Sequence, residues 1–228
     1  MLGGEPDIPD GAVIELIEQR LQDREARDRL LHRPVISQIL DSTIKDLSRC
    51  PDFTGHVREQ LQPIIVSVVR FLAFCLDSQR GSEFSHTLYL FKPDAIEAEL
   101  QQHLIEWFRA SGFTDLVVEA QQIGAGRIDL MFTFGGFRFV IELKRERDNA
   151  TREGLSAYLR QAGAYQATDI AIGMLMVLDL TADPLPDHMR DHVWVDVIPP
   201  SESGGTERNI AVIRIPGNRT APSRLSSH

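Results

Sequence analysis

The sequence predicts an α/β protein in which helices flank a central mixed β-sheet, preceded by an all-helical N-terminal region. Two observations carry this prediction. Up to about residue 80 the apolar residues recur at helical spacing, whereas beyond residue 110 they gather in short runs rich in Val, Ile, Phe and Leu. A helical pattern returns at residues 151–167, between strand-like runs, and this alternation is typical of α/β domains.

The N-terminal region is expected to hold three helices, at residues 12–31, 34–47 and 56–76. The first two patterns are amphipathic. The third contains the apolar run PIIVSVVRFLAFCL, which is too short for a membrane span and includes Arg70, so we expect a buried core helix. We assign residues 1–85 to this helical region and expect it to form a homodimer or to dock onto a larger complex.

The α/β domain is expected to follow the polar segment SQRGSEFSH and to span residues 86–200. Residues 201–228 are then a peripheral strand and a loose tail. The expected elements, in chain order, are a helix at 94–110, strands at 116–121, 127–134 and 137–144, a helix at 151–167 that Thr151 caps, and strands at 170–180, 193–198 and 210–215.

Composition narrows the class of protein. The formal net charge of −9 argues against a broadly basic nucleic-acid binder, yet it is compatible with an enzyme whose metal site needs carboxylates. Between residues 127 and 165, basic residues outnumber acidic ones by seven to five, so this stretch is locally positive. Cys50 and Cys75 lack metal-site spacing, and the first residues do not resemble a signal peptide. We therefore expect a reduced, cytoplasmic protein with no membrane partner.

Three charged residues stand in the apolar stretch GRIDLMFTFGGFRFVIELK, at residues 126–144. The Gly-Gly pair predicts a tight antiparallel hairpin, which sets Phe134 opposite Phe137 and Asp129 opposite Glu142. Directly opposed side chains share a face, with Cβ atoms roughly 4.5–5.5 Å apart, so the two carboxylates repel each other. A divalent cation bound between them would turn this repulsion into ligation.

Lys144 lies two residues beyond Glu142 and therefore on the same face of the strand. It could neutralise charge on a phosphate or assist an attacking water. The alternative is an ordinary solvated charged face. The residues around the three charges are apolar on both faces of the hairpin, which favours a metal site.

With these elements the chain resembles the PD-(D/E)xK nuclease superfamily, which has the restriction-endonuclease-like fold. The resemblance covers about residues 94–180 and rests on Asp129, then Glu142-Leu143-Lys144, in the order helix, three strands, helix, strand. Arg127-Ile128 stand where the family name has its proline. The resemblance implies an αβββαβ core in which Asp129, Glu142 and the main-chain carbonyl of Leu143 hold Mg²⁺, for which Mn²⁺ can substitute. It places Lys144 at the scissile phosphate.

The flanking helices offer further candidates. Many members of the superfamily carry an acid on the first helix, and Glu97 shares a face with the apolar residues of this helix, with Glu99 as the second choice. On the second helix, Gln161 and Tyr165 are four residues apart and resemble the Gln-x-x-x-Tyr feature of related nucleases, whose side chains line the site and touch nucleic acid. Both pairs also fit ordinary amphipathic helices. Basic residues beside the site, among them Arg127 and Arg145, are candidate phosphate contacts.

The function expected from these residues is a Mg²⁺-dependent deoxyribonuclease that binds DNA, in repair, restriction or antiviral defence. Asp129, Glu142, Lys144, Glu97 and Gln161 form its expected catalytic set. Two alternatives stay open. The fold could serve as a catalytically silent module that binds nucleic acid or a partner protein, or the N-terminal helices could make the chain an adaptor.

Overall fold

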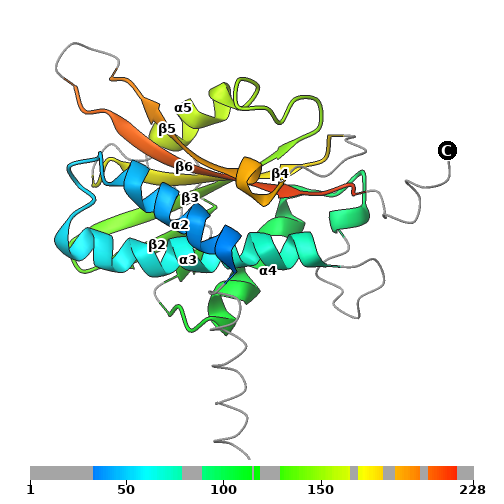
Figure 1. Cartoon of the computed structure of the whole chain (residues 1–228), viewed down its shortest axis with the longest axis horizontal. Helices are drawn as coiled ribbons and strands as arrows, with labels where there is room; N and C mark the ends of the chain where they lie inside the picture. The colour runs from blue at the N-terminus through cyan, green and yellow to red at the C-terminus, as the bar shows by residue number, and fades with distance from the viewer. Residues whose placement is uncertain are drawn as a thin grey trace, which may run out of the picture.

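A six-stranded mixed sheet forms the centre of the protein, with the strand order β1-β2-β3-β4-β6-β5 (Figure 1). The computed structural model describes residues 33–78, 89–114, 116–118, 129–164, 169–181, 188–200 and 205–219. Strands β3, β4 and β6 run parallel, while β1, β2 and β5 are antiparallel to their neighbours. The strands are β1 (Leu116–Val118), β2 (Leu130–Phe134), β3 (Phe137–Glu146), β4 (Ile172–Asp179), β5 (Val193–Ile198) and β6 (Arg208–Pro216).

Helices cover both faces of this sheet (Figure 1). One face packs against α2 (Pro34–Leu47), α3 (Gly55–Asp77) and α4 (Glu97–Ala110), which contribute to the larger hydrophobic cluster. The other face packs against α5 (Ser156–Ala164) in a smaller cluster that includes Leu159, Leu175 and Val212. Strand β4 is buried along its whole length because side chains on both of its faces meet helices. The predicted α/β class with a central mixed sheet and helices on its flanks is confirmed.

Helix boundaries agree with the sequence pattern at α2 and differ at α5. The helix expected at residues 151–167 should begin after a Thr151 cap, but α5 begins at Ser156. The reason is a competing turn, in which the main-chain N–H and the hydroxyl of Thr151 both donate to Oδ1 of Asn149, at 3.1 and 2.6 Å. The Thr151 side chain is therefore engaged in this turn, and the chain makes further turns before α5 starts.

Helices α2 and α3 do not form a core of their own. Buried residues of α2 and α3 belong to the same hydrophobic cluster as those of β3, β4 and β6. Residues 1–32 and 79–88, which include the first expected helix and most of the expected domain boundary, lie outside the described residues. The strand expected at the periphery, β6, instead lies inside the sheet, because it pairs with β4 on one side and β5 on the other, and Ile210 and Ile213 are buried on its opposite faces.

Helix α3 is the one described helix that is long and apolar enough to span a membrane. Its most apolar window is 56% buried within the protein. Residues such as Val68, Phe71 and Leu72 are fully enclosed by neighbouring elements. This packing favours the predicted core helix over a membrane span.

Candidate functional site

The site lies where β3 extends beyond β2. The hairpin has the predicted register, with Phe134 opposite Phe137 and Leu130 opposite Ile141. Its turn requires glycine at Gly136, whose φ is +120°. The expected pair of Asp129 with Glu142 would be the next step of this register, but the pairing of β2 with β3 ends at Leu130 and Ile141. Because β2 begins at Leu130 while β3 continues to its end, the last five residues of β3 pair with β4 alone.

Two carboxylates bind the main-chain donors that this overhang exposes. Asp129 Oδ2 accepts a hydrogen bond of 2.8 Å from the Leu143 N–H, and Glu97 accepts one from the Arg145 main chain. The N–H and C=O of a strand residue point to the same neighbouring side, so the Leu143 carbonyl also points toward Asp129. From α4, Gln101 donates to the Asp129 carbonyl oxygen at 3.1 Å and holds the start of β2 in place.

Glu142 and Lys144 form a close ion pair on the face of the sheet that α5 covers. Lys144 Nζ lies 2.6 Å from Glu142 Oε1, and the two side chains are 17% and 1% exposed, respectively. The second carboxylate oxygen, Glu142 Oε2, is buried and has no hydrogen-bond partner among the described residues. An enclosed carboxylate oxygen without a donor is costly unless another group completes it. The site therefore has one oxygen suited to a further cation or donor.

The titration properties of these groups reflect crowding of negative charge. Burial raises the pKa of Glu142, and the charges of Asp129 and Glu97 raise it further against the opposing effect of Lys144. Burial also raises the pKa of Glu97, with a contribution from Asp129. Burial alone would lower the pKa of Lys144, but its hydrogen bond to Glu142 and the nearby carboxylates outweigh burial, and its pKa is raised. Lys144 thus interacts electrostatically with three carboxylates.

The two candidate acids on α4 have different positions. Glu97 feels the charges of Lys144 and Asp129, so it belongs to the cluster. Glu99 instead caps its own helix, because it accepts from the Ile96 N–H at 2.8 Å and pairs with Lys92 at 2.9 Å. The preferred acid of the first helix is therefore the one that reaches the site, and the second choice has a structural partner elsewhere.

Helix α5 brings a residue of the predicted face to the cluster, although not the one named for it. Gln161 is exposed on α5. Three residues earlier, the Tyr158 hydroxyl donates to Glu146 Oε2 at 3.1 Å, and its pKa is raised by burial and by Glu146. Lys144 and Glu97 also act on this hydroxyl. Tyr165, like Arg127, lies outside the residues that the structure describes.

Glu146 was missed by the sequence analysis, although its alternation with Glu142 and Lys144 was a usable signal. Its Oε1 accepts from the N–H groups of three successive residues at 2.7–3.1 Å: Arg147, Asp148 and Asn149. Burial alone would raise the pKa of Glu146, but these N–H groups and Tyr158 lower it. Glu146 thereby fixes the chain where it leaves β3 toward α5.

The arginine predicted to contact phosphate has a different place. Arg145 points to the opposite face of β3 from Glu142 and donates to the Ala95 carbonyl oxygen at 3.1 Å. Its guanidinium therefore braces the segment before α4. Arg152, further along the chain, pairs with Asp196 of β5. Arg147 is exposed beside the cluster and is the better placed of the three to meet a phosphate.

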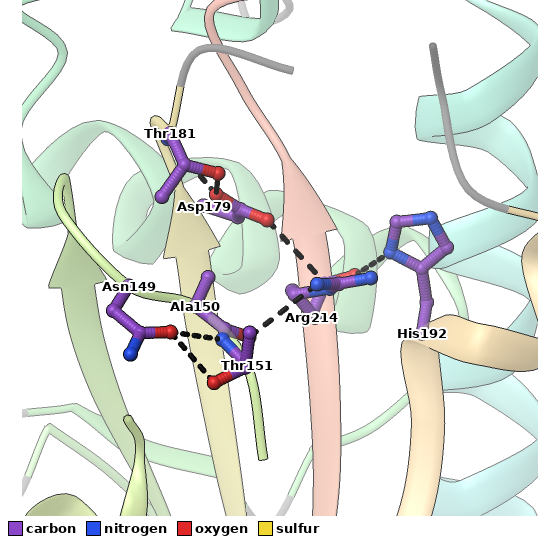
Figure 2. Close-up of polar contacts among 7 residues, drawn as sticks. All are labelled: Asn149, Ala150, Thr151, Asp179, Thr181, His192 and Arg214. Carbon is purple, nitrogen blue, oxygen red and sulfur yellow. Dashed lines mark hydrogen bonds and ion pairs between the residues drawn. The ribbon is translucent and has the colours of Figure 1, made fainter. Parts of the chain in front are cut away.

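A second polar cluster lies on the same face, at the ends of β4 and β6. Figure 2 shows Asp179 between Thr181 and Arg214. Asp179 Oδ1 accepts from the N–H and the hydroxyl of Thr181 at 2.9 and 2.5 Å, and its Oδ2 lies 3.6 Å from Arg214 Nε. Arg214 also donates to the Ala150 carbonyl oxygen at 3.4 Å, and its own carbonyl oxygen contacts Nδ1 of His192. This cluster ties the chain after β3 to the centre of the sheet.

The donors for a metal ion at the first cluster would be oxygen atoms of Asp129, Glu142 and Glu97, with the Leu143 carbonyl beside them. Oxygen ligands of this kind suit Mg²⁺, and the unpartnered Glu142 Oε2 fits such an ion. In the arrangement that the structure describes, no three His, Cys, Asp or Glu side chains already converge as a metal-binding group. Comparison of the chain with family models, curated proteins and solved structures found no match.

Proposed function

We propose that this protein is a Mg²⁺-dependent nuclease that hydrolyses phosphodiester bonds in DNA, with a restriction-endonuclease-like αβββαβ core. The observation that carries the proposal is the buried pair of Glu142 with Lys144 at the end of β3, beside the Asp129 carboxylate that accepts the Leu143 N–H. The element order α4-β1-β2-β3-α5-β4 agrees with the predicted core. In this order Glu97 belongs to α4, Asp129 comes just before β2, and Glu142 belongs to β3.

Each residue has a role in this reaction that its surroundings support. Asp129 and Glu142 would hold the ion, with Glu97 and the Leu143 carbonyl completing its ligands. An ion held there would lower the pKa of a bound water and offset charge on the phosphate. Lys144 supplies an ammonium group 2.6 Å from Glu142, where it can donate to a phosphate oxygen or orient the water. Gln161 and Arg147 are exposed on the segment after β3 and can contact the DNA backbone.

A cleavage assay tests this function directly. The purified chain is incubated with linear, circular, branched and single-stranded DNA in Mg²⁺ or Mn²⁺, and with a chelator. Wild-type protein should cleave at least one substrate only when a divalent ion is present, and Asp129→Ala should not. No cleavage by folded wild-type protein across all substrates would remove the proposal.

The two acids of α4 supply a matched pair for the same assay. Glu97→Gln removes a charge from the cluster and should slow cleavage on the order of 10²-fold or more, as losses of electrostatic stabilisation do. Glu99→Gln removes a charge of the same size from the helix cap, which lies outside the cluster, and should leave the rate near that of wild type. Equal effects of the two substitutions would exclude Glu97 from the site.

One observation favours a second candidate function, a catalytically silent module that binds nucleic acid or a partner protein. Asp129, Glu97 and Glu142 all have partners within the chain, namely two main-chain donors and Lys144. Such a cluster can hold the strand end together without an ion. The same assay separates the two functions, because a silent module would bind DNA without divalent ions and would leave it intact.

A further inference from the structure

The ion pair between Lys144 and Glu142 bears on how a metal ion and a substrate would enter the site. Lys144 Nζ occupies Glu142 Oε1 at 2.6 Å, and Glu142 is 1% exposed. No second cation among the described residues contacts this carboxylate. A lysine held this closely to a buried carboxylate competes with any other cation for that oxygen, and the charge of the carboxylate offsets the charge that the lysine could offer to a phosphate.

The charges of the cluster are also unbalanced. When all groups are ionised, three carboxylates and one ammonium leave two negative charges, which a single divalent ion would cancel. Without that ion the cluster repels a phosphate. Once the ion shares the carboxylates, Lys144 is no longer needed by Glu142 and becomes free to pair with the phosphate.

From this geometry we infer that Lys144 acts as an internal counter-ion, which passes from Glu142 to a substrate phosphate when a divalent ion binds. The two ligands therefore bind cooperatively, because each removes an obstacle to the other. By linkage, DNA raises the affinity for the ion by the same factor as the ion raises the affinity for DNA. The inference rests on the proposed function and adds that the resting site is closed by its own lysine.

The test measures binding and does not depend on cleavage. Mn²⁺ affinity is measured from the free-ion signal in electron paramagnetic resonance, with and without a hydrolysis-resistant phosphorothioate DNA duplex. Wild-type protein should bind Mn²⁺ about tenfold more tightly with DNA than without it, within the usual range of such couplings. Lys144→Met should bind Mn²⁺ more tightly than wild type in the absence of DNA and should gain less from adding DNA.

Lys92→Met is the matched control, because Lys92 forms a pair of similar length with Glu99 outside the cluster. It should bind Mn²⁺ like wild type. Wild-type affinity that DNA leaves unchanged would overturn the inference, and so would a folded Lys144→Met protein that binds Mn²⁺ no more tightly than the control.

A second variant covers the case in which Lys144→Met does not fold. Glu142→Gln keeps an oxygen that can accept from Lys144 but removes the charge that holds the lysine. In the absence of divalent ions it should bind the DNA duplex several-fold more tightly than wild type, and an unchanged affinity would contradict the inference. Failure of the proposed function would be recognised by a different result. Wild-type protein would then not cleave unmodified DNA, whatever the binding data show.

Discussion

Lys144 and Arg214 lie in one row across the sheet, with Val177 between them, on the face that α5 covers. Each is a partly buried cation beside a buried carboxylate. Arg214 faces Asp179, whose other oxygen is bound by Thr181. Lys144 faces Glu142, and the charges of Glu97 and Asp129 also act on it. The two regions share position and residue types but differ in charge balance.

The difference separates a structural cluster from a candidate active site. Around Arg214, the guanidinium lies beside the Asp179 carboxylate and donates to the Ala150 carbonyl oxygen, and Asp179 accepts from the N–H and the hydroxyl of Thr181. Around Lys144, negative charge is in excess and a carboxylate oxygen is left without a donor. Surplus charge in a buried place lowers the stability of the fold, so its presence suggests a ligand that the fold is built to receive.

The largest expected effects come from exchanging each cation for an apolar side chain. Lys144→Met should reduce the cleavage rate on the order of 10²–10³-fold, as loss of one electrostatic contact to the reacting group does. Arg214→Met should leave the rate of the folded fraction near wild type but lower the free energy of unfolding by about 3 kcal/mol, because Asp179 stays buried without its partner. Single-turnover cleavage and urea unfolding measure the two quantities. The comparison fails if both variants lose activity in proportion to their loss of stability.

A second pair of variants applies the same comparison to the acids. Asparagine at position 129 can still accept the Leu143 N–H, so Asp129→Asn should lose cleavage and change the free energy of unfolding by less than about 1 kcal/mol. Asp179→Asn keeps an acceptor for Thr181 but loses its charge beside Arg214, and should cost about 1–3 kcal/mol of stability while cleavage persists. Thermal unfolding and the cleavage assay together measure this difference, in which Asp129→Asn loses cleavage but not stability and Asp179→Asn loses stability but not cleavage. A stability loss for Asp129→Asn as large as that for Asp179→Asn would assign Asp129 a structural role.

The sequence was sufficient for the features that local chemistry decides. The two-residue glycine turn determined the hairpin register, from Phe134 opposite Phe137 to Leu130 opposite Ile141, and Asp129 lies one residue beyond these pairs. Helical spacing favoured Glu97 over Glu99, and in the structure Lys144 and Asp129 act on the Glu97 carboxylate. The nuclease function itself stays a prediction.

What the sequence did not predict depends on contacts between distant segments. The role of Arg145 as a brace follows from the position of Ala95, fifty residues away in the chain. The place of β6 inside the sheet follows from pairing with strands on both sides. The late start of α5 reflects a turn in which Asn149 competes for Thr151. In each case the residue type was compatible with several partners, and only the assembled sheet selected one.

A smaller effect is expected from neutralising Glu142. Its pKa is raised in the folded protein, so between the ordinary value of 4.5 and the raised value the fold binds more protons than the unfolded chain. Stability contributed by this group therefore falls as the pH rises through that window. Glu142→Gln should unfold at a higher temperature than wild type at pH 8, with a difference that shrinks toward pH 4. The opposite trend, a variant less stable at pH 8, would mean that the pair with Lys144 outweighs the cost of burial.

The smallest effect is expected from Tyr158→Phe, which removes only the hydroxyl that joins α5 to Glu146. Glu146 keeps its three main-chain donors, so the loss should be about 1 kcal/mol in the free energy of unfolding, the usual contribution of one hydrogen bond. Cleavage should change less than it does in Glu97→Gln. Urea unfolding and the single-turnover rate measure both. A large fall in rate at unchanged stability would instead place the Tyr158 hydroxyl against the substrate. The site around Lys144 would then include a residue of α5, Tyr158, as well as a residue of α4, Glu97.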